Sequence, residues 1–283
     1  MIPAKLQEQF TNNPLTYRQR LTIPESIHFG VEIEVENIRY NEFYTLIIKQ
    51  FGTNWKVKKD DSLDPTSGAE IASPILINKK ETWLLLKKLG ELLSRLRASY
   101  ADCSFQINFD GKLLPTDEDK IRFLKLYAMY EDIIYRFSKG EDNTYRQCID
   151  MYASPISLFL KDQLKLKNKA LILAAFTNNK RYGIIFKKGA KNLIEFRTPN
   201  GTSNPILWQN YITTFYYLLK NFNNPRFDKT TIDEYIENFT TIDMLSEYEK
   251  ENLSKATNFA NIIFKKQTDQ LYFLQQYLSL RRN

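Results

Sequence analysis

The chain has 283 residues, of which 43% are hydrophobic and 26% are charged, and this balance excludes a disordered or collagen-like protein. The formal net charge of +7 permits an anionic partner, but the lysines are scattered and no basic motif is interleaved with aromatic residues, so we expect no nucleic-acid partner. The two cysteines do not have metal-finger spacing, and the sequence shows neither a signal-peptide pattern nor an apolar run long enough to cross a membrane. We therefore expect a cytoplasmic protein with no membrane partner.

The first predicted element is a strand over residues 28–36, in which apolar residues and glutamates alternate with the two-residue period of a β-strand. Glu32, Glu34 and Glu36 therefore share one face, with about 6.6 Å between neighbours at roughly 3.3 Å per residue. Three carboxylates at this spacing repel one another unless water screens them or a cation such as Mg²⁺ bridges them. A strand with one solvated face has the same pattern, and both interpretations stay open at this point.

Helices and extended segments alternate over the next part of the chain. The predicted elements are a helix over 41–51 with Asn41 as N-cap and Gly52 as C′ residue, a strand over 55–59, an Asp-rich loop over 60–68, an extended segment over 70–76, a helix over 82–100 and a strand over 103–110. In the last strand Cys103 faces the core with its apolar neighbours, whereas Gln106 and Asn108 face the other side.

The second half of the chain is richer in helices. The predicted elements are a helix over 116–137 with Thr116 as N-cap, a helix over 157–178, a hairpin of 181–186 and 192–197 turning at 188–190, a helix from Asn204 and Pro205 to residue 222, and only helices beyond 225. We therefore predict an α+β fold with a mainly antiparallel β-sheet whose helices pack on its outer face. Residues 1–224 would form the main domain, and residues 225–283 an α-helical C-terminal extension.

Several predicted strands carry functional side chains on the face opposite their apolar residues. From the first strand to the last, these are Glu32, Glu34, Glu70, Gln106, Asn108, Glu195 and Arg197. If the strands form one sheet, these side chains would converge in one concave site. Carboxylates, amides and an arginine together suit metal ions bound to a nucleoside triphosphate. Solvated strand faces would look similar, so the pattern alone leaves that alternative open.

Five motifs occur in an order that resembles the amidoligase family. They are Phe29-Gly-Val-Glu-Ile-Glu-Val, Asp61-Ser-Leu before Gly68-Ala-Glu-Ile-Ala-Ser-Pro, Cys103-Ser-Phe-Gln-Ile-Asn-Phe, Tyr130-Glu-Asp-Ile-Ile-Tyr-Arg before Arg146, and Ile194-Glu-Phe-Arg before Asn200-Gly-Thr. That family belongs with the glutamine synthetase and γ-glutamylcysteine ligase type of carboxylate–amine ligases, and the match covers about residues 28–210. The resemblance implies a glutamine synthetase-like fold, with residues 1–224 as the catalytic domain.

The resemblance also implies an ATP-dependent enzyme that uses Mg²⁺ or Mn²⁺. Such an enzyme joins the carboxylate of an amino acid or peptide to an amine acceptor through an acyl phosphate. The residues that match the family's metal and nucleotide ligands are Glu32, Glu34, Glu70 and Glu195. Arg197 matches a residue that contacts phosphate, and these five residues would be the catalytic set.

Four further residues match nucleotide-binding or substrate-binding positions: Gln106, Asn108, Arg136 and Arg146. Gln106 and Asn108 stand where many amidoligases carry His-x-His. A neutral amide is a weaker cation ligand than imidazole, so this corner departs from the family pattern.

Two other functions stay open from the sequence: a non-catalytic protein-binding or nucleic-acid-binding protein that keeps the ligase fold, and a phosphotransferase that uses the same site. Neither a P-loop nor a Rossmann glycine motif occurs. The sequence contains one histidine, His28, and no nucleophile-elbow motif with which it could form a catalytic triad, so we expect His28 to have a packing or capping role. Cys103 is expected to be a core thiol. Glu36 matches no family position and is predicted to be solvated. The oligomeric state is left open.

Overall fold

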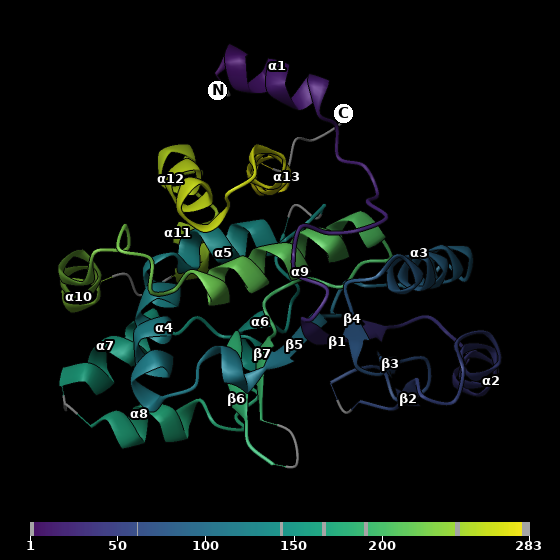
Figure 1. Cartoon of the computed structure of the whole chain (residues 1–283). Coiled ribbons are helices and arrows are strands. Elements are labelled where there is room, and N and C mark those ends of the chain that lie inside the picture. Colours follow the sequence, from purple (N-terminus) through teal and green to yellow (C-terminus); the bar gives the residue numbers. More distant parts are fainter. Residues whose placement is uncertain are drawn as a thin grey trace.

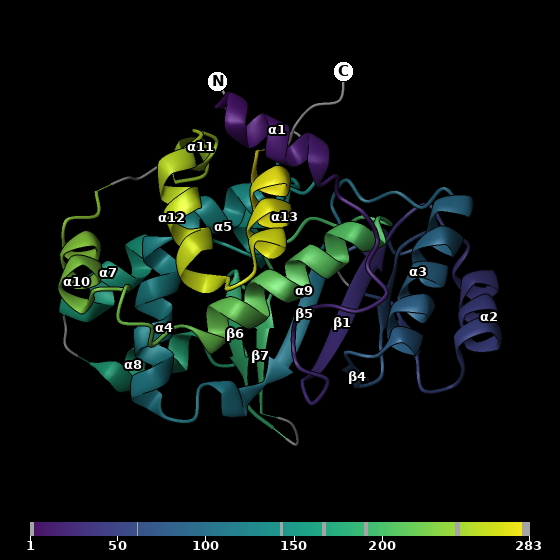
Figure 2. The same ribbon diagram turned by 45° about the horizontal axis from the view of Figure 1, so that its top comes forward.

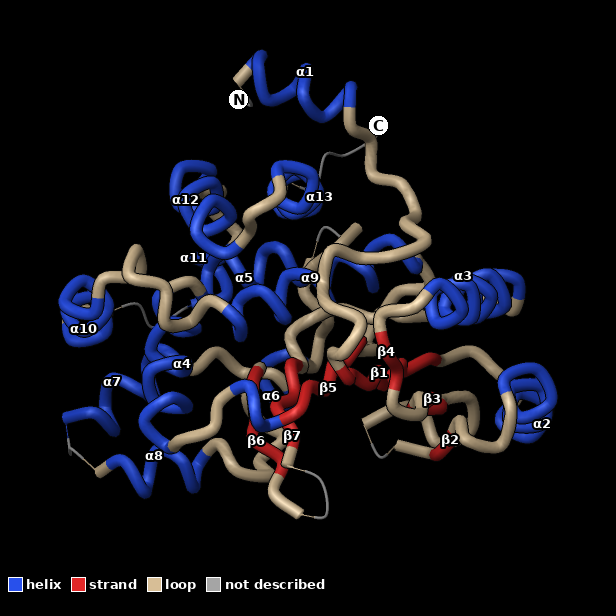
Figure 3. The backbone as a smooth tube through the Cα atoms, in the orientation of Figure 1, coloured by secondary structure: helices blue, strands red, loops and turns tan. Residues whose placement is uncertain are grey.

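The computed structural model describes residues 3–60, 62–141, 144–165, 168–189, 192–240 and 244–278. Over these ranges the chain has the predicted α+β class, with an antiparallel β-sheet, many helices and a helical region at the C-terminal end (Figure 1). The tube view shows the strands gathered in one part of the molecule, with helices above them and to both sides (Figure 3).

The strands form one sheet whose order differs from their order in the chain. Within the described residues it runs β2 (Lys56–Lys58), β3 (Ala69–Ala72), β1 (His28–Val35), β5 (Phe105–Asp110), β7 (Leu193–Phe196), β6 (Ile184–Lys187), and β4 (Leu76–Ile77) pairs with the start of β1. Each of these pairings is antiparallel, as predicted. The predicted hairpin of β6 and β7 is confirmed, while Ala190 of its predicted turn lies outside the described residues.

Helix α9 (Pro205–Lys220) lies across the apolar face of the sheet (Figure 2). Its Trp208 stacks on Phe105 of β5 with ring centroids 5.5 Å apart, and its Phe215 stacks on Phe196 of β7 at 4.2 Å. Each of these side chains is fully buried, which is worth about 1.5–3 kcal/mol per side chain relative to exposure. Because this helix covers the apolar face, the polar residues of the strands lie on the opposite face.

The other helices surround this central pair of layers. They are α1 (Ala4–Asn12), α2 (Tyr40–Phe51), α3 (Lys80–Arg95), α4 (Asp117–Met129), α5 (Glu131–Ser138), α6 (Ile149–Tyr152), α7 (Ser157–Lys165), α8 (Lys169–Ala175), α10 (Lys229–Glu237), α11 (Met244–Tyr248), α12 (Leu253–Ile263) and α13 (Gln267–Tyr277). Two predicted helix starts are confirmed. Thr116 forms a reciprocal capping box with Asp119 at the start of α4, and Asn204 caps α9 ahead of Pro205.

Other predicted helix limits are wrong. Helix α2 starts at Tyr40 with Arg39 at its N-cap, not Asn41, because the burial of its apolar side chains rather than a side-chain cap fixes its start. Its predicted end is confirmed, since Gly52 follows it with φ +90°. The single helices predicted over 116–137 and 157–178 are each two helices, α4 with α5 and α7 with α8. The helix predicted over 82–100 is α3, which ends at Arg95.

The C-terminal helices pack on the helical layer above the sheet (Figure 2). Phe273 of α13 contacts Phe137 of α5 at 4.8 Å between ring centroids, and Phe259 of α12 contacts Tyr130 at 4.9 Å. The described residues beyond 225 contain helices and no strand, as predicted, and the boundary at residue 224 stays a prediction. Among the described residues, none of the helices combines the length and hydropathy that crossing a bilayer requires.

Candidate functional site

The antiparallel register brings the predicted polar residues to one face of the sheet. Glu34 of β1 pairs with Glu70 of β3, Glu32 pairs with Gln106 of β5, and Asn108 pairs with Glu195 of β7. Directly opposed residues of an antiparallel pair point to the same side of the sheet. The convergence predicted from the alternating patterns is therefore confirmed for Glu32, Glu34, Glu70, Gln106, Asn108, Glu195 and Arg197.

The two amides of β5 act as donors to the carboxylates of β1. Gln106 donates from Nε2 to Glu34 Oε1 at 2.7 Å, and Asn108 donates from Nδ2 to Glu32 Oε1 at 2.9 Å. Arg197 donates to Gln106 Oε1 at 2.8 Å and to Glu195 Oε1 at 2.7 Å. Both ends of Gln106 are thus used inside the protein. The Gln-x-Asn pair holds carboxylates in place, which is a task for neutral donors rather than for metal ligands.

Two lysines that the sequence analysis counted among scattered charges belong to the site. Lys187 of β6 forms ion pairs with both Glu32, at 3.2 Å, and Glu195. Lys58 of β2 forms an ion pair with Glu70 at 2.8 Å. Each lysine lies on a short strand of three or four residues, where the two-residue period is too brief to assign a face.

Asp60 is a further carboxylate that the sequence analysis did not single out. It follows β2, and one of its carboxylate oxygens lies with oxygens of Glu34 and Glu70 in a group whose members are all within 4.8 Å of one another. Its Oδ1 also accepts a hydrogen bond from the backbone N–H of Ser62 at 2.9 Å, which fixes its orientation. Three carboxylates at this separation are a donor set that suits a hard divalent cation. We call Glu34, Asp60 and Glu70 the acidic triad.

The pKa values of Glu70 and Glu32 show how burial and the neighbouring charges compete on this face. Burial and the neighbouring Glu32 carboxylate raise the pKa of Glu70 to about 8, although Lys58 opposes them. Burial would also raise the pKa of Glu32, but the ammonium groups of Lys187 and Lys58 outweigh it and hold that pKa below its ordinary value. Near neutral pH Glu70 therefore keeps a proton beside an ionised Glu32. A cation bound at the triad would replace this proton.

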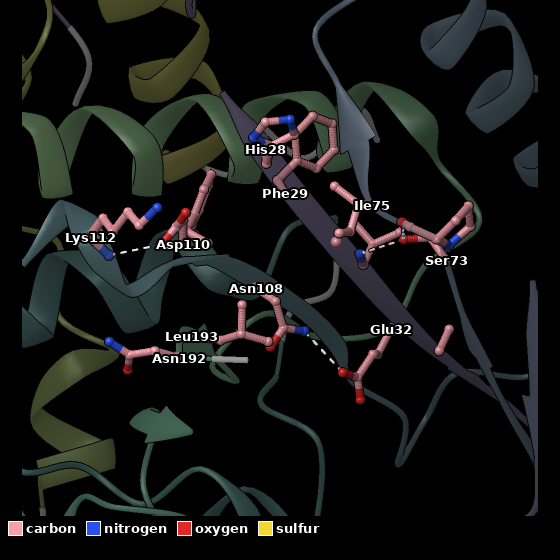
Figure 4. Close-up of a pocket in the computed structure, with 15 residues that line it drawn as sticks. His28, Phe29, Glu32, Ser73, Ile75, Asn108, Asp110, Lys112, Asn192 and Leu193 are labelled. Atoms are coloured by element: carbon pink, nitrogen blue, oxygen red, sulfur yellow. Dashed lines mark hydrogen bonds between the residues drawn. The ribbon is translucent and has the colours of Figure 1, made fainter. Parts of the chain in front are cut away.

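A cavity of about 530 Å³ adjoins this charged face at the start of β1 (Figure 4). Glu32 and Asn108 line the end of the cavity that meets the charged face, and Figure 4 shows the amide nitrogen of Asn108 directed at the carboxylate of Glu32. Ile75 of the segment after β3 and Leu193 of β7 contribute apolar surface. His28, predicted to pack or cap, is instead an exposed residue at the rim of this cavity.

Two of the predicted arginines do not face the site. Arg136 on α5 binds the backbone oxygen of Glu249 and lies 5.4 Å from the ring of Tyr277, so its partners come from the C-terminal helical region and the structure does not bring it to the polar sheet face. Arg146 is buried and donates to the carbonyl oxygens of residues 197, 198 and 199 at 2.8 to 3.3 Å. It supports the segment after β7 and presents no ligand-binding group in this arrangement.

The structure also settles two minor predictions. Cys103 is fully buried, and burial raises the pKa of its thiol well above the ordinary value, so the core assignment is confirmed. Glu36 was predicted to be solvated, but it is only half-exposed and its carboxylate accepts a hydrogen bond from the backbone N–H of Asp64 at 3.1 Å. Glu36 therefore anchors the Asp-rich loop, and it forms no contact with the acidic triad in the part of the chain that the structure describes.

A comparison with models of known protein families finds no match to this chain. The resemblance to amidoligases, which came from short motifs, stays a prediction. A functional proposal must accordingly start from the chemistry of the site: a triad of carboxylates, three nearby cationic side chains and an adjoining cavity.

Proposed function

We propose that the protein is an ATP- and Mg²⁺-dependent carboxylate–amine ligase with a glutamine synthetase-like fold. The observation that carries the proposal is the pairing, on one sheet face, of the acidic triad with the cations of Lys58, Lys187 and Arg197. A triphosphate with its metal ion needs both kinds of group close together, carboxylates for the metal and cations for the phosphate oxygens.

The residues of the triad fit Mg²⁺. Their ligand atoms are carboxylate oxygens within 4.8 Å of one another, and Asp60 is partly exposed, which leaves room for the water ligands that Mg²⁺ keeps. The raised pKa of Glu70 is a second reason, because burial and the neighbouring Glu32 both disfavour its ionised form, which a bound divalent cation would stabilise. When bound, Mg²⁺ would screen the charge of the triphosphate so that an anionic carboxylate can approach it.

The chain's own cations would then bind the phosphate oxygens. Lys187 bridges Glu32 and Glu195, and its side chain is 29% exposed, so it can exchange one carboxylate for a phosphate oxygen of a ligand. Arg197 is held by Glu195 and Gln106, which fixes the direction of its guanidinium. A fixed guanidinium would stabilise the charge that develops as the substrate carboxylate attacks the γ-phosphate and ADP leaves. An amine would then attack the acyl carbon of the acyl phosphate, and inorganic phosphate would leave as the amide forms.

The test is release of ADP and phosphate from ATP and Mg²⁺ in a screen of amino acids and peptides with amine acceptors, followed by mass spectrometry of the products. We expect an amide product, and we expect Asp60→Asn to lower the Mg²⁺-dependent rate at least 100-fold, or about 2.7 kcal/mol of transition-state stabilisation. Glu36→Gln is the matched control: it changes a carboxylate next to the same loop but outside the triad, so its rate should stay within about twofold.

Three outcomes would contradict the ligase assignment. A phosphorylated product without an amide would identify a phosphotransferase that uses the same face. Absence of Mg²⁺-ATP binding by calorimetry, with salt-sensitive binding to a protein or nucleic acid, would identify a non-catalytic binding protein. Equal loss of rate in Asp60→Asn and Glu36→Gln would show that the loop, not the triad, matters.

A further inference from the structure

The cavity at the start of β1 has an unsatisfied polar group at its inner end. Asn108 is only 6% exposed, and its Nδ2 donates to Glu32, whereas its Oδ1 has no hydrogen-bond partner among the described residues. Turning the amide over would place its oxygen against the carboxylate of Glu32, so the free atom is the acceptor. A buried acceptor without a donor costs free energy, because it loses its hydrogen bond to water and gains none in the protein. A ligand that supplies an N–H or O–H at this point would remove that cost.

The walls of the cavity are apolar and leave space that the fold does not fill. Ile75 at the cavity is 61% exposed, one of the most exposed large hydrophobic side chains that the structure describes. Gly30 lies on the same face as Glu32, and a Cβ added there would come no closer than 3.8 Å to Ser73 Oγ and 3.9 Å to Asn108 Cβ. The glycine thus keeps open a volume large enough for a small organic ligand, which would also cover the isoleucine.

The charge at the inner end selects the ligand's polar group. The groups presented there are the carboxylate of Glu32 and the amide oxygen of Asn108, and Asp110 lies two residues further along the same face of β5. A ligand carboxylate or phosphate could pair with Lys187, which lies beside Glu32, but it would leave Asn108 Oδ1 without a donor and place its own charge near Glu32 and Asp110. A primary ammonium carries three donors and no acceptor, and it satisfies both groups at once.

The position of the cavity argues against a nucleotide base as its occupant. Glu32, at its inner end, lies on the same face of the sheet as Glu34 and Glu70 of the acidic triad, and its carboxylate is close enough to raise the pKa of Glu70. A ligand group at Asn108 would therefore lie only one side chain away from the triad. The ribose and the phosphates of ATP separate its base from the terminal phosphate by much more than this, whereas an amine that attacks an acyl phosphate must lie this close.

We propose that this cavity binds a primary amine carried on an apolar body. Its amino group would be held by Asn108 Oδ1 and Glu32, and its body would lie between Gly30, Ile75 and Leu193. The further statement that this amine is the acceptor substrate rests on the ligase function proposed above, but the binding itself does not.

The experiment measures binding of 2-phenylethylamine to the full chain by isothermal titration calorimetry and saturation-transfer NMR, beside 3-phenylpropionate, which has a similar body and the opposite charge. We expect the amine to bind at least tenfold more tightly than the acid. Gly30→Leu, which fills the cavity, and Asn108→Leu, which removes the free acceptor, should each weaken amine binding at least tenfold. Leu84→Ala, at an exposed leucine of α3 outside the cavity, is the control and should bind like the unchanged protein.

Melting in the presence and absence of Mg²⁺ alone shows whether each variant keeps its fold, and Gly30→Ala serves as a milder variant if Gly30→Leu unfolds. Equal binding of acid and amine, or unchanged amine binding in both cavity variants, would overturn the proposal. So would displacement of the amine by Mg²⁺-ATP together with loss of ATP binding in the Gly30 variants, because the cavity would then hold the base. If the amine does not bind but the chain still releases ADP, only the present proposal is overturned. If the amine binds but no ADP is released under any condition, the ligase function is overturned and the amine-binding site remains supported.

Discussion

Two buried carboxylates, Glu131 and Glu70, lie in different regions and have opposite surroundings. Glu131, at the start of α5, is fully buried and accepts hydrogen bonds from the backbone N–H groups of Ile156 and Ser157 and from the hydroxyls of Ser157 and Tyr248, at 2.5 to 3.0 Å. These donors are neutral and come from two parts of the chain, the start of α7 and the end of α11. Burial raises the pKa of Glu131 to about 7 against the opposing effect of these donors.

Glu70 is equally buried, but its neighbours are charged. It lies beside the carboxylate of Glu32, which together with burial raises its pKa, and it depends on Lys58, a half-exposed side chain, for its ion pair. The chain therefore supplies a full set of donors to one buried carboxylate and places a second beside a like charge. Glu131 is therefore a structural carboxylate, stabilised by its donors. Glu70 is buried at a cost in folding free energy, and such a cost indicates a residue that binds a ligand.

The largest expected effect concerns the structural carboxylate. Glu131→Ala would leave two backbone N–H groups and two hydroxyls of the helical region without their acceptor, so we expect a loss of about 3–5 kcal/mol in the free energy of unfolding. Urea denaturation followed by circular dichroism measures this. Glu247→Gln, at an exposed carboxylate of α11 paired with Lys250, is the control and should change the stability by less than about 0.5 kcal/mol. If Glu131→Ala lowered the free energy of unfolding by less than about 1 kcal/mol, Glu131 would not be the structural carboxylate that we contrast with Glu70.

The next effect has the opposite sign. Because the pKa of Glu70 in the folded chain, about 8, lies above its ordinary value of 4.5, its protonated form favours folding, and that contribution is lost as the pH rises from about 4.5 through 8. Glu70→Gln keeps a neutral side chain at every pH. We therefore expect the variant to match the unchanged protein near pH 4 and to be more stable by at least about 2 kcal/mol near pH 9, since the two pKa values differ by well over one unit and each unit corresponds to about 1.4 kcal/mol.

The measurement is a set of urea denaturation curves across that pH range, read as the difference between the two proteins so that other titrating groups cancel. A stabilised Glu70→Gln that also loses binding of Mg²⁺ would connect the stability cost to the ligand. A variant that is less stable than the unchanged protein at high pH would show that the ion pair with Lys58, not the repulsion by Glu32, dominates at this position.

Much of the sheet and half of the site could be predicted from the sequence. The two-residue alternation assigns Glu32, Glu34, Gln106 and Asn108 to one face, and the caps at Thr116 and Asn204 fix two helix starts, because these signals act between residues close in the chain. The order of the strands is not present in such a pattern, since it depends on contacts between distant segments.

The site residues that the sequence analysis missed, and the position of Arg136 away from the site, follow from the same limit. Lys58 and Lys187 reach the site only because β2 and β6 lie on either side of the central strands, and the position of Asp60 depends on its loop. Arg136 fits a family motif, yet its partners Glu249 and Glu251 come from a region more than a hundred residues further along the chain. A local motif cannot show which distant helix will pack beside it.

Binding of Mg²⁺ should depend on pH in the way that the acidic triad predicts. Below a pKa of about 8 the ion must displace the proton on Glu70, so its affinity should rise almost tenfold per pH unit up to that value and level off above it. Titration calorimetry in two buffers of different ionisation enthalpy would show about one proton released per ion at pH 6.5. In Glu70→Gln any Mg²⁺ binding that remains should be weaker and should not depend on pH in this range, and remaining binding that keeps the dependence would place the titrating group elsewhere.

The smallest expected effect on stability is that of Lys58→Gln, and this variant tests the difference between Glu70 and Glu131 most directly. Lys58 is half-exposed, so Lys58→Gln should change the stability by less than about 1 kcal/mol at pH 6, where Glu70 is protonated. The same change removes the cation that lowers the pKa of Glu70, so the pH midpoint of that group should move upward, above 8. NMR of the side-chain carboxyl carbon of Glu70 measures the midpoint. No lysine pairs with Glu131 in the described part of the chain, so its midpoint should stay near 7 in this variant, and a parallel shift of both carboxylates would mean that long-range charge rather than local pairing sets their pKa values.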